Sequence, residues 1–295
     1  MMHLCRLRRK SLQCAVLGLL LATSAFAQGP QRILIRVPVA NMFSAPSADT
    51  DVVSQAIYAT EVTPLEQRAA FTRVRTPDNY TGWIRNEELL PQPGGAPSAA
   101  VVAQVRPLSA NLYHEPNVTK HAPVVAVPFE TRLEMILQAQ PENRDYLHIR
   151  LLDGGDAWIA RGDVEVNVRP LTITESIELA KRFLGVTYTW GGRSSYGFDC
   201  SGFTQMLVRS RGINMPRDAD MQASWPGMDQ VKRKHLKPGD LLFVGAAADS
   251  ITHTGMYIGK GRFVHDTTNG HPGVQISRLK EQPWTRLLVA ARRVK

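Results

Sequence analysis

A pattern that occurs twice in the first half of this 295-residue chain constrains its fold more than any other feature. The two copies span residues 33–91 and 101–168. Each opens with N-(M/L)-(F/Y)-x-x-P, at Asn41 and Asn111, and closes with (G/A)-W-I. Between these marks lie short runs rich in Val, Ile, Tyr and Trp, broken by Pro and Gly, which favour β-strands. We therefore predict two small all-β barrels, at residues 28–91 and 101–168.

Two further segments have the character of a leader and a linker. Residues 1–27 combine a basic start, an apolar stretch from Ser11 and the small-residue end Ala25-Phe26-Ala27, which is typical of a secretory signal peptide. Residues 92–100 read QPGGAPSAA, a Gly- and Pro-rich composition that indicates a flexible linker. We expect an exported protein, in the periplasm, the cell envelope or the medium, with no stable membrane insertion once the leader is removed.

Removal of the leader changes both the cysteine count and the charge. Cys5 and Cys14 leave with it, so Cys200 stays alone and has no partner for a disulfide. The formal net charge of +9 includes four leader cations, and the remaining chain carries about +5 without polybasic blocks. This charge fits an anionic envelope surface and gives little reason to expect a nucleic-acid partner. The oligomeric state stays open.

The pattern changes after Val168. Thr172 and Glu175 form a capping-box pattern ahead of apolar residues at helical spacing, and Gly185 ends that helix. A second helix is expected over 200–211. Strand-like runs follow at residues 240–245, 254–259, 262–267 and 287–292. Helices followed by consecutive strands predict an α+β domain with a central antiparallel sheet, at residues 169–295.

Cys200 is the principal candidate for chemistry. A thiol in the first turn of a helix feels the positive end of the helix dipole, which is expected to lower its pKa and to favour the thiolate. The alternative is a small buried apolar residue. A cysteine nucleophile needs a base, and His253 and His265 lie on two consecutive predicted strands, whereas His271 lies in a Gly/Pro loop.

Residues 171–295 resemble the NlpC/p60 endopeptidases, papain-like cysteine peptidases that act on bacterial cell-wall peptides. The matching motifs, in chain order, are Tyr188-x-Trp190-Gly191-Gly192, Asp199-Cys200-Ser201-Gly202, Pro216-Arg217, Lys237-Pro238-Gly239-Asp240-Leu241, His253-x-Gly255-x-Tyr257-x-Gly259 and Phe263-x-His265. The two barrels are similar to the bacterial SH3-like (SH3b) domain.

The resemblance implies a Cys-His-His triad. Cys200 would be the nucleophile, His253 the general base and His265 the group that orients it. Tyr188 would assist the oxyanion site, and Asp199 and Ser201 would contact substrate, although Asp199 fits a helix cap equally well. The family commonly has Ser where this chain has Ala219, so one substrate hydrogen bond is expected to be missing. The sequence has no clustered metal ligands and no nucleotide-binding motif, so we expect no cofactor.

The leading hypothesis is a peptidoglycan peptide hydrolase that cleaves γ-D-glutamyl-L-diamino acid bonds through a thioester, on intact wall or on released stem peptides. The first barrel would narrow the cleft and select a free N-terminal L-Ala, with Tyr80 as the contact. One alternative is an amidase or acyltransferase with the same Cys-His apparatus. Another is a wall-binding protein with an idle catalytic domain, which the presence of all three triad residues disfavours.

Strand parity gives a geometric prediction about the two histidines. A two-residue turn at Lys260-Gly261 would place them on opposite faces of the sheet. A three-residue loop over residues 259–261 pairs Gly255 with His265 and makes His253 a diagonal neighbour on the same face. We therefore predict a bulged loop with positive φ at Gly261, and both rings on the face that carries Cys200.

Overall fold

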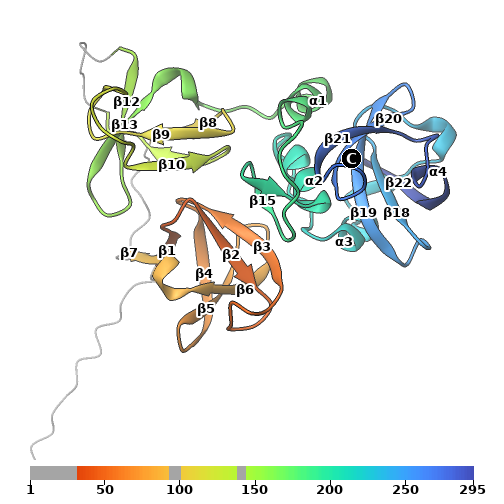
Figure 1. The fold of residues 1–295 in the computed structure, drawn as a ribbon, viewed down its shortest axis with the longest axis horizontal. Coiled ribbons are helices and arrows are strands. Elements are labelled where there is room, and N and C mark those ends of the chain that lie inside the picture. The colour runs from red at the N-terminus through yellow and green to blue at the C-terminus, as the bar shows by residue number, and fades with distance from the viewer. Residues whose placement is uncertain (1–31, 93–100, 138–143) are drawn as a thin grey trace, which may run out of the picture.

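The computed structural model describes residues 32–92, 101–137 and 144–295 and shows three folded parts (Figure 1). The predicted signal peptide, and the predicted linker apart from Gln92, lie outside the described residues. Within these residues, no helix has the length and apolar character needed to cross a membrane.

The first part is a seven-stranded antiparallel barrel in which the strands lie in the order β3-β2-β6-β5-β4-β1-β7. The repeated motif supplies its core, because Met42 and Ile84 are both fully buried. The strands are β1 (Arg32–Ile35), β2 (Val39–Phe43), β3 (Val52–Ile57), β4 (Glu61–Arg68), β5 (Phe71–Arg75), β6 (Thr81–Arg85) and β7 (Leu89–Gln92).

The second part is built from three small antiparallel sheets, ordered β11-β8-β14, β10-β9 and β12-β13. Leu112 and Ile159, the counterparts of Met42 and Ile84 in the second copy of the motif, are likewise fully buried. The same sequence marks therefore serve the same packing role in both barrels. The strands are β8 (Val102–Val105), β9 (Ser109–Leu112), β10 (Val125–Pro128), β11 (Arg132–Glu134), β12 (Tyr146–Arg150), β13 (Asp156–Ala160) and β14 (Val164–Val166).

The third part is an α+β domain around a six-stranded sheet ordered β17-β22-β18-β19-β20-β21, in which every adjacent pair is antiparallel. The sheet contains the four predicted strands and two that were not predicted, β17 and β21. Its elements are α1 (Ile173–Arg182), β15 (Arg193–Ser194), β16 (Gly197–Phe198), α2 (Cys200–Arg209), α3 (Ala219–Ser224), β17 (Met228–Gln230), β18 (Leu241–Gly245), β19 (Ile251–Gly259), β20 (Arg262–Thr267), β21 (Gly273–Arg278), α4 (Trp284–Leu287) and β22 (Leu288–Val294).

Side-chain caps fix where the two main helices begin. At α1, the Thr172 hydroxyl accepts from the Glu175 backbone N–H at 3.2 Å, and the Glu175 carboxylate accepts from the Thr172 N–H at 2.8 Å, which completes the predicted capping box. At α2, the Asp199 carboxylate accepts from the Gly202 N–H at 2.7 Å. Cys200 is therefore the first helical residue, and this cap sets its position.

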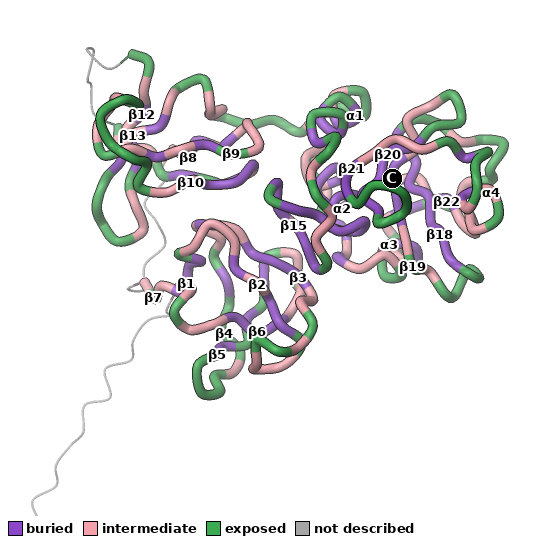
Figure 2. Tube along the Cα trace, viewed as in Figure 1, coloured by how far each residue is buried: buried purple, intermediate pink, exposed green. Residues whose placement is uncertain are grey.

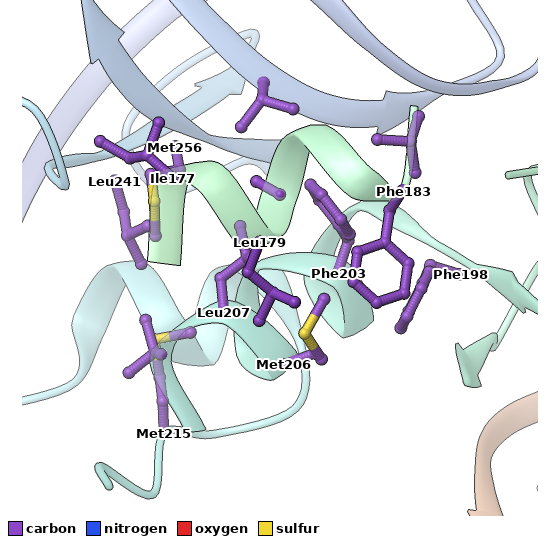
Figure 3. Packing of buried hydrophobic residues seen from close by; sticks show 14 of the residues in the cluster. Ile177, Leu179, Phe183, Phe198, Phe203, Met206, Leu207, Met215, Leu241 and Met256 are labelled. Carbon is purple, nitrogen blue, oxygen red and sulfur yellow. The ribbon is translucent and has the colours of Figure 1, made fainter. Parts of the chain in front are cut away.

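One large core holds α1 and α2 against the sheet (Figure 3). Phe183, Phe198 and Phe203 pack edge to face in its centre, with ring centroids 5.5–6.3 Å apart. Met256 and Val264 join this core from β19 and β20. The tube in Figure 2 is accordingly buried along most of α2, along β18 and along most of β20. The helix that begins at Cys200 is thus anchored on the sheet that carries the two histidines.

Candidate active site

The register of β19 and β20 is the predicted one. Met256 lies opposite Val264 and Tyr257 opposite Phe263, so Gly255 faces His265. The turn itself differs from the prediction. Gly259 pairs with Arg262 around a two-residue turn, in which Lys260 and Gly261 have φ of 52° and 70°, as a type I′ turn requires. A bulge between Tyr257 and Gly259 adds the extra residue that the predicted loop would have supplied, and it restores the same register.

A chain of hydrogen bonds joins the two histidines to a serine. His253 Nε2 lies 2.8 Å from His265 Nδ1, and His265 Nε2 lies 3.0 Å from the Ser277 hydroxyl on β21. Sequence reasoning missed Ser277 because it missed β21. The parity rule would have found it, since β21 places Gln275 opposite His265 and Ser277 two residues away on the same face.

The two rings share one face of the sheet, but it is not the face that α2 covers. They pack beside Trp284 of α4, with ring centroids 5.3 Å from it for His253 and 4.8 Å for His265. The body of α2 packs with Met256 and Val264 on the opposite face, so the predicted shared face does not extend to the helix that follows Cys200. Cys200 meets β19 at the backbone instead, since the Thr254 N–H, next to His253, points to its sulfur.

Burial decides the protonation of the thiol and the imidazole. It raises the pKa of Cys200 to about 12, with Asp199 adding to the effect and the Thr254 and Ser201 amides and Arg217 opposing it. Burial also lowers the pKa of His253 to about 4. The expected lowered thiol pKa is therefore wrong, because desolvation outweighs the helix start. At neutral pH Cys200 is therefore a thiol and His253 a neutral imidazole.

Asp199 and Ser201 flank the thiol in a buried polar network. The Asp199 carboxylate caps α2. It also accepts hydrogen bonds from Nη1 and Nη2 of Arg217, at 2.9 and 2.6 Å. The Ser201 hydroxyl accepts from Arg217 Nη1 at 2.8 Å and donates to Asp199 at 3.2 Å. Sequence reasoning gave Arg217 no role beyond its motif, although the structure places it at the centre of this network.

Tyr188, near the thiol, and Asp266, near Tyr188, are two further ionisable groups of this region. Burial, followed by the nearby Cys200 and Asp199, raises the pKa of the Tyr188 phenol, which stays protonated at neutral pH. Asp266 is 0% exposed, and neither carboxylate oxygen has a hydrogen-bond partner among the described residues. Burial, and then Asp199, raise the pKa of Asp266 to about 8. The sequence gave no sign of this carboxyl, since it follows His265 in an ordinary strand.

The first barrel approaches the site through Tyr80. Its hydroxyl donates to the Asp218 carboxylate at 2.9 Å, across the junction between barrel and catalytic domain. Both residues line an open cavity of about 620 Å³, whose walls also include Met221 and Trp225. Ala219, which stands where the family commonly has Ser, begins the adjacent helix α3. The barrel thus forms one wall of this cavity, with a carboxylate and a phenol at the junction.

Two family models match parts of this chain. The family model described as NlpC/P60 family matches residues 185–293, and that described as Bacterial dipeptidyl-peptidase Sh3 domain matches residues 42–89. The gamma-D-glutamyl-L-lysine dipeptidyl-peptidase of Bacillus cereus is 30% identical over 259 residues, which cover 81% of this chain and 74% of that protein. The chain belongs to the NlpC/P60 family. The predicted resemblance and the predicted peptidase class are confirmed.

A second relative and a solved structure are also similar to this chain. The gamma-D-glutamyl-L-lysine dipeptidyl-peptidase of Bacillus subtilis is 35% identical over 142 residues, 47% of each chain. A crystal structure of an NlpC/P60 family protein from Bacillus cereus superimposes with a TM-score of 0.78 at 25% identity, and covers 89% of this chain and 99% of that one. The α+β catalytic fold behind all-β SH3-like domains is therefore confirmed.

Proposed function

We propose that this protein is an exported cysteine endopeptidase that cleaves peptidoglycan stem peptides between γ-D-glutamate and the L-centre of a diamino acid. The observation that carries the proposal is a buried thiol at a helix start that meets the Thr254 backbone, next to the first residue of a hydrogen-bonded His253–His265–Ser277 chain. The relative from Bacillus cereus, whose name describes that bond with lysine, supports the substrate class. The leader-like residues 1–27 support a periplasmic or envelope location.

One arrangement of protons along these hydrogen bonds leaves His253 able to act as the base. If His253 donates from Nε2 to His265 Nδ1, then His265 donates from Nε2 to Ser277, and His253 Nδ1 keeps a free lone pair. That lone pair takes the Cys200 proton as sulfur attacks the scissile carbonyl. Because the resting pair is neutral, the base acts during attack rather than before it.

The remaining steps use groups already beside the thiol. Backbone amides at the start of α2 and the protonated Tyr188 hydroxyl stabilise the oxyanion. Protonated His253 then gives its proton to the leaving amine, and the carbon–nitrogen bond breaks to leave a thioester on Cys200. Water, deprotonated by the same imidazole, hydrolyses the thioester and regenerates the thiol.

His265→Ala is expected to lower kcat roughly 10- to 100-fold, because His253 keeps its place on β19 but loses the partner that fixes its tautomer. Ser277→Ala should cost less, about 3- to 10-fold, because it acts one hydrogen bond further away. Steady-state kinetics on a tripeptide substrate measure both. A silent His265→Ala together with an inactive His271→Ala would show that the triad is assigned wrongly.

Selection of a free N-terminus is assigned to the junction between the first barrel and the catalytic domain. A substrate ammonium in this cavity would meet the Asp218 carboxylate, which the Tyr80 hydroxyl holds in place. The test compares the tripeptide L-Ala-γ-D-Glu-L-diamino acid with its N-acetylated form by mass spectrometry of the products. We expect release of L-Ala-γ-D-Glu, and a loss of roughly 10- to 100-fold in kcat/KM on acetylation.

Asp218→Asn should remove most of that preference, whereas Asp220→Asn, at the second residue of α3, should keep it. An equal rate on both peptides with the native protein would rule out amine selection here. Digestion of muropeptides separates the other hypotheses, since an amidase would release a stem that begins with free L-Ala. Retention on peptidoglycan without any hydrolysis would instead indicate a wall-binding protein with an idle site.

A further inference from the structure

Both barrels bind the one helix that carries the thiol. At the middle of α2, Gln205 Nε2 donates to Asp78 of the first barrel at 2.9 Å. At its end, Arg209 contacts Glu130 of the second barrel at 2.6 Å. At its beginning, the cap Asp199 is held by Arg217, which in turn contacts the first barrel. The position of α2 therefore depends on residues from all three parts of the chain.

Arg217 makes the connection nearest to the thiol. It is 2% exposed, and Nε donates to the hydroxyl of Ser54 on β3 at 3.2 Å. Its Nη1 and Nη2 bind the two Asp199 oxygens, and they also reach Ser201 and the Gly192 carbonyl. The guanidinium is planar, so fixing its Nε edge fixes the direction of the fork that holds the cap.

The surrounding junction is closely packed. Gly191 has φ of +72°, and a side chain there would collide with the backbone oxygen of Val52 on β3. Next to it, the Gln55 carboxamide oxygen accepts from the Arg193 N–H at 3.0 Å. Ser54 is itself only 1% exposed. The first barrel therefore packs directly against the loop and strand that precede Cys200. This packing leaves the Arg217 side chain little room to move.

The contact between Arg217 and Asp199 affects the ionisation of the Cys200 thiol. Asp199 opposes ionisation of Cys200, and Arg217 favours it. A guanidinium that stays on Asp199 partly cancels the carboxylate charge next to the sulfur, whereas one that drifts away leaves that charge exposed to it. The alignment of Arg217 therefore affects how readily the thiol loses its proton during attack, in addition to the larger effect of burial.

We propose that Ser54 is a positioning residue through which the docked first barrel sets the reactivity of Cys200, by holding Arg217 against Asp199. The barrel then belongs to the catalytic apparatus as well as to the wall of the substrate cavity. The proposal rests on Cys200 being the nucleophile of the proposed function.

The test measures alkylation of Cys200 by iodoacetamide across pH 6–10 in the full chain, with the modified peptide quantified by mass spectrometry. Ser54→Ala should slow alkylation at neutral pH about 3- to 10-fold and move the pH profile upward, with a matching fall in kcat and little change in KM. Ser44→Ala, an exposed serine of the same barrel, is the matched control and should behave like the native protein.

Two further variants separate this role from docking alone. Gln55→Ala weakens the junction without touching Arg217, so its alkylation profile should stay native. Arg217→Lys keeps the charge but loses both the Nε–H that meets Ser54 and the fork that binds Asp199, so it should slow alkylation even if Ser54→Ala fails to fold. A native profile in folded Ser54→Ala or in folded Arg217→Lys would overturn the proposal. A shifted profile in a protein that cleaves no stem peptide would instead refute only the proposed substrate.

Discussion

Cys200→Ala abolishes hydrolysis of stem peptides, with an expected fall in kcat/KM of roughly 10⁴-fold or more. The sulfur forms the covalent intermediate, and no other described cysteine is available to replace it. The fold should persist, because the change removes one atom from a small side chain at the first turn of α2. Its cap, Asp199, makes its hydrogen bonds to Gly202 and Arg217 rather than to the thiol. Product release by mass spectrometry and the melting temperature measure the two effects.

Cys200→Ser is the matched variant, since it keeps the shape and a proton donor but replaces the thiol by a hydroxyl that His253 is not placed to ionise. It should also be inactive with a native melting temperature. Rapid turnover by either folded variant would exclude a thioester mechanism. Inactivity together with loss of the fold would mean that the thiol has a structural role.

The fold and the relation between the two histidines follow from local sequence patterns. Alternation of side chains along a strand is a short-range property, so the pairing of β19 with β20 follows from the positions of Gly259 and Gly261. Even there, the turn was predicted wrongly. A three-residue loop and a two-residue turn with a bulge produce the same register, and the sequence pattern does not separate them.

The electrostatics of the site depend on contacts that no local pattern contains. Ser54 and Arg217 are separated by 163 positions in the chain, and their contact exists only because the first barrel docks beside Gly191. The pKa of Cys200 was predicted in the wrong direction for a similar reason. The position of the thiol at a helix start is visible in the sequence, but its burial is not.

Asp266→Asn is expected to stabilise the protein at pH 8, by an amount that shrinks as the pH falls toward 4. Burial raises the pKa of Asp266 from 3.8 to about 8, so between these values the unfolded chain ionises the carboxyl while the folded chain keeps it protonated. The folded state therefore loses stability as pH rises through this window, at up to about 1.4 kcal/mol for each pH unit. Asparagine is neutral in both states, so the Asp266→Asn variant does not lose this stability. Its melting temperature at pH 8 should therefore be several degrees above that of the native protein.

Asp240→Asn is the matched control, because Asp240 is also buried but pairs with Arg293 at 2.7 and 2.8 Å. Loss of that ion pair should lower the melting temperature at pH 8, whereas Asp266→Asn should raise it. Thermal unfolding of both variants and the native protein at pH 4, 6 and 8 gives the comparison. A difference between Asp266→Asn and the native protein that stays constant over this range would mean that Asp266 ionises normally when folded. A difference that grows with pH would identify it as a buried carboxyl that the fold holds neutral.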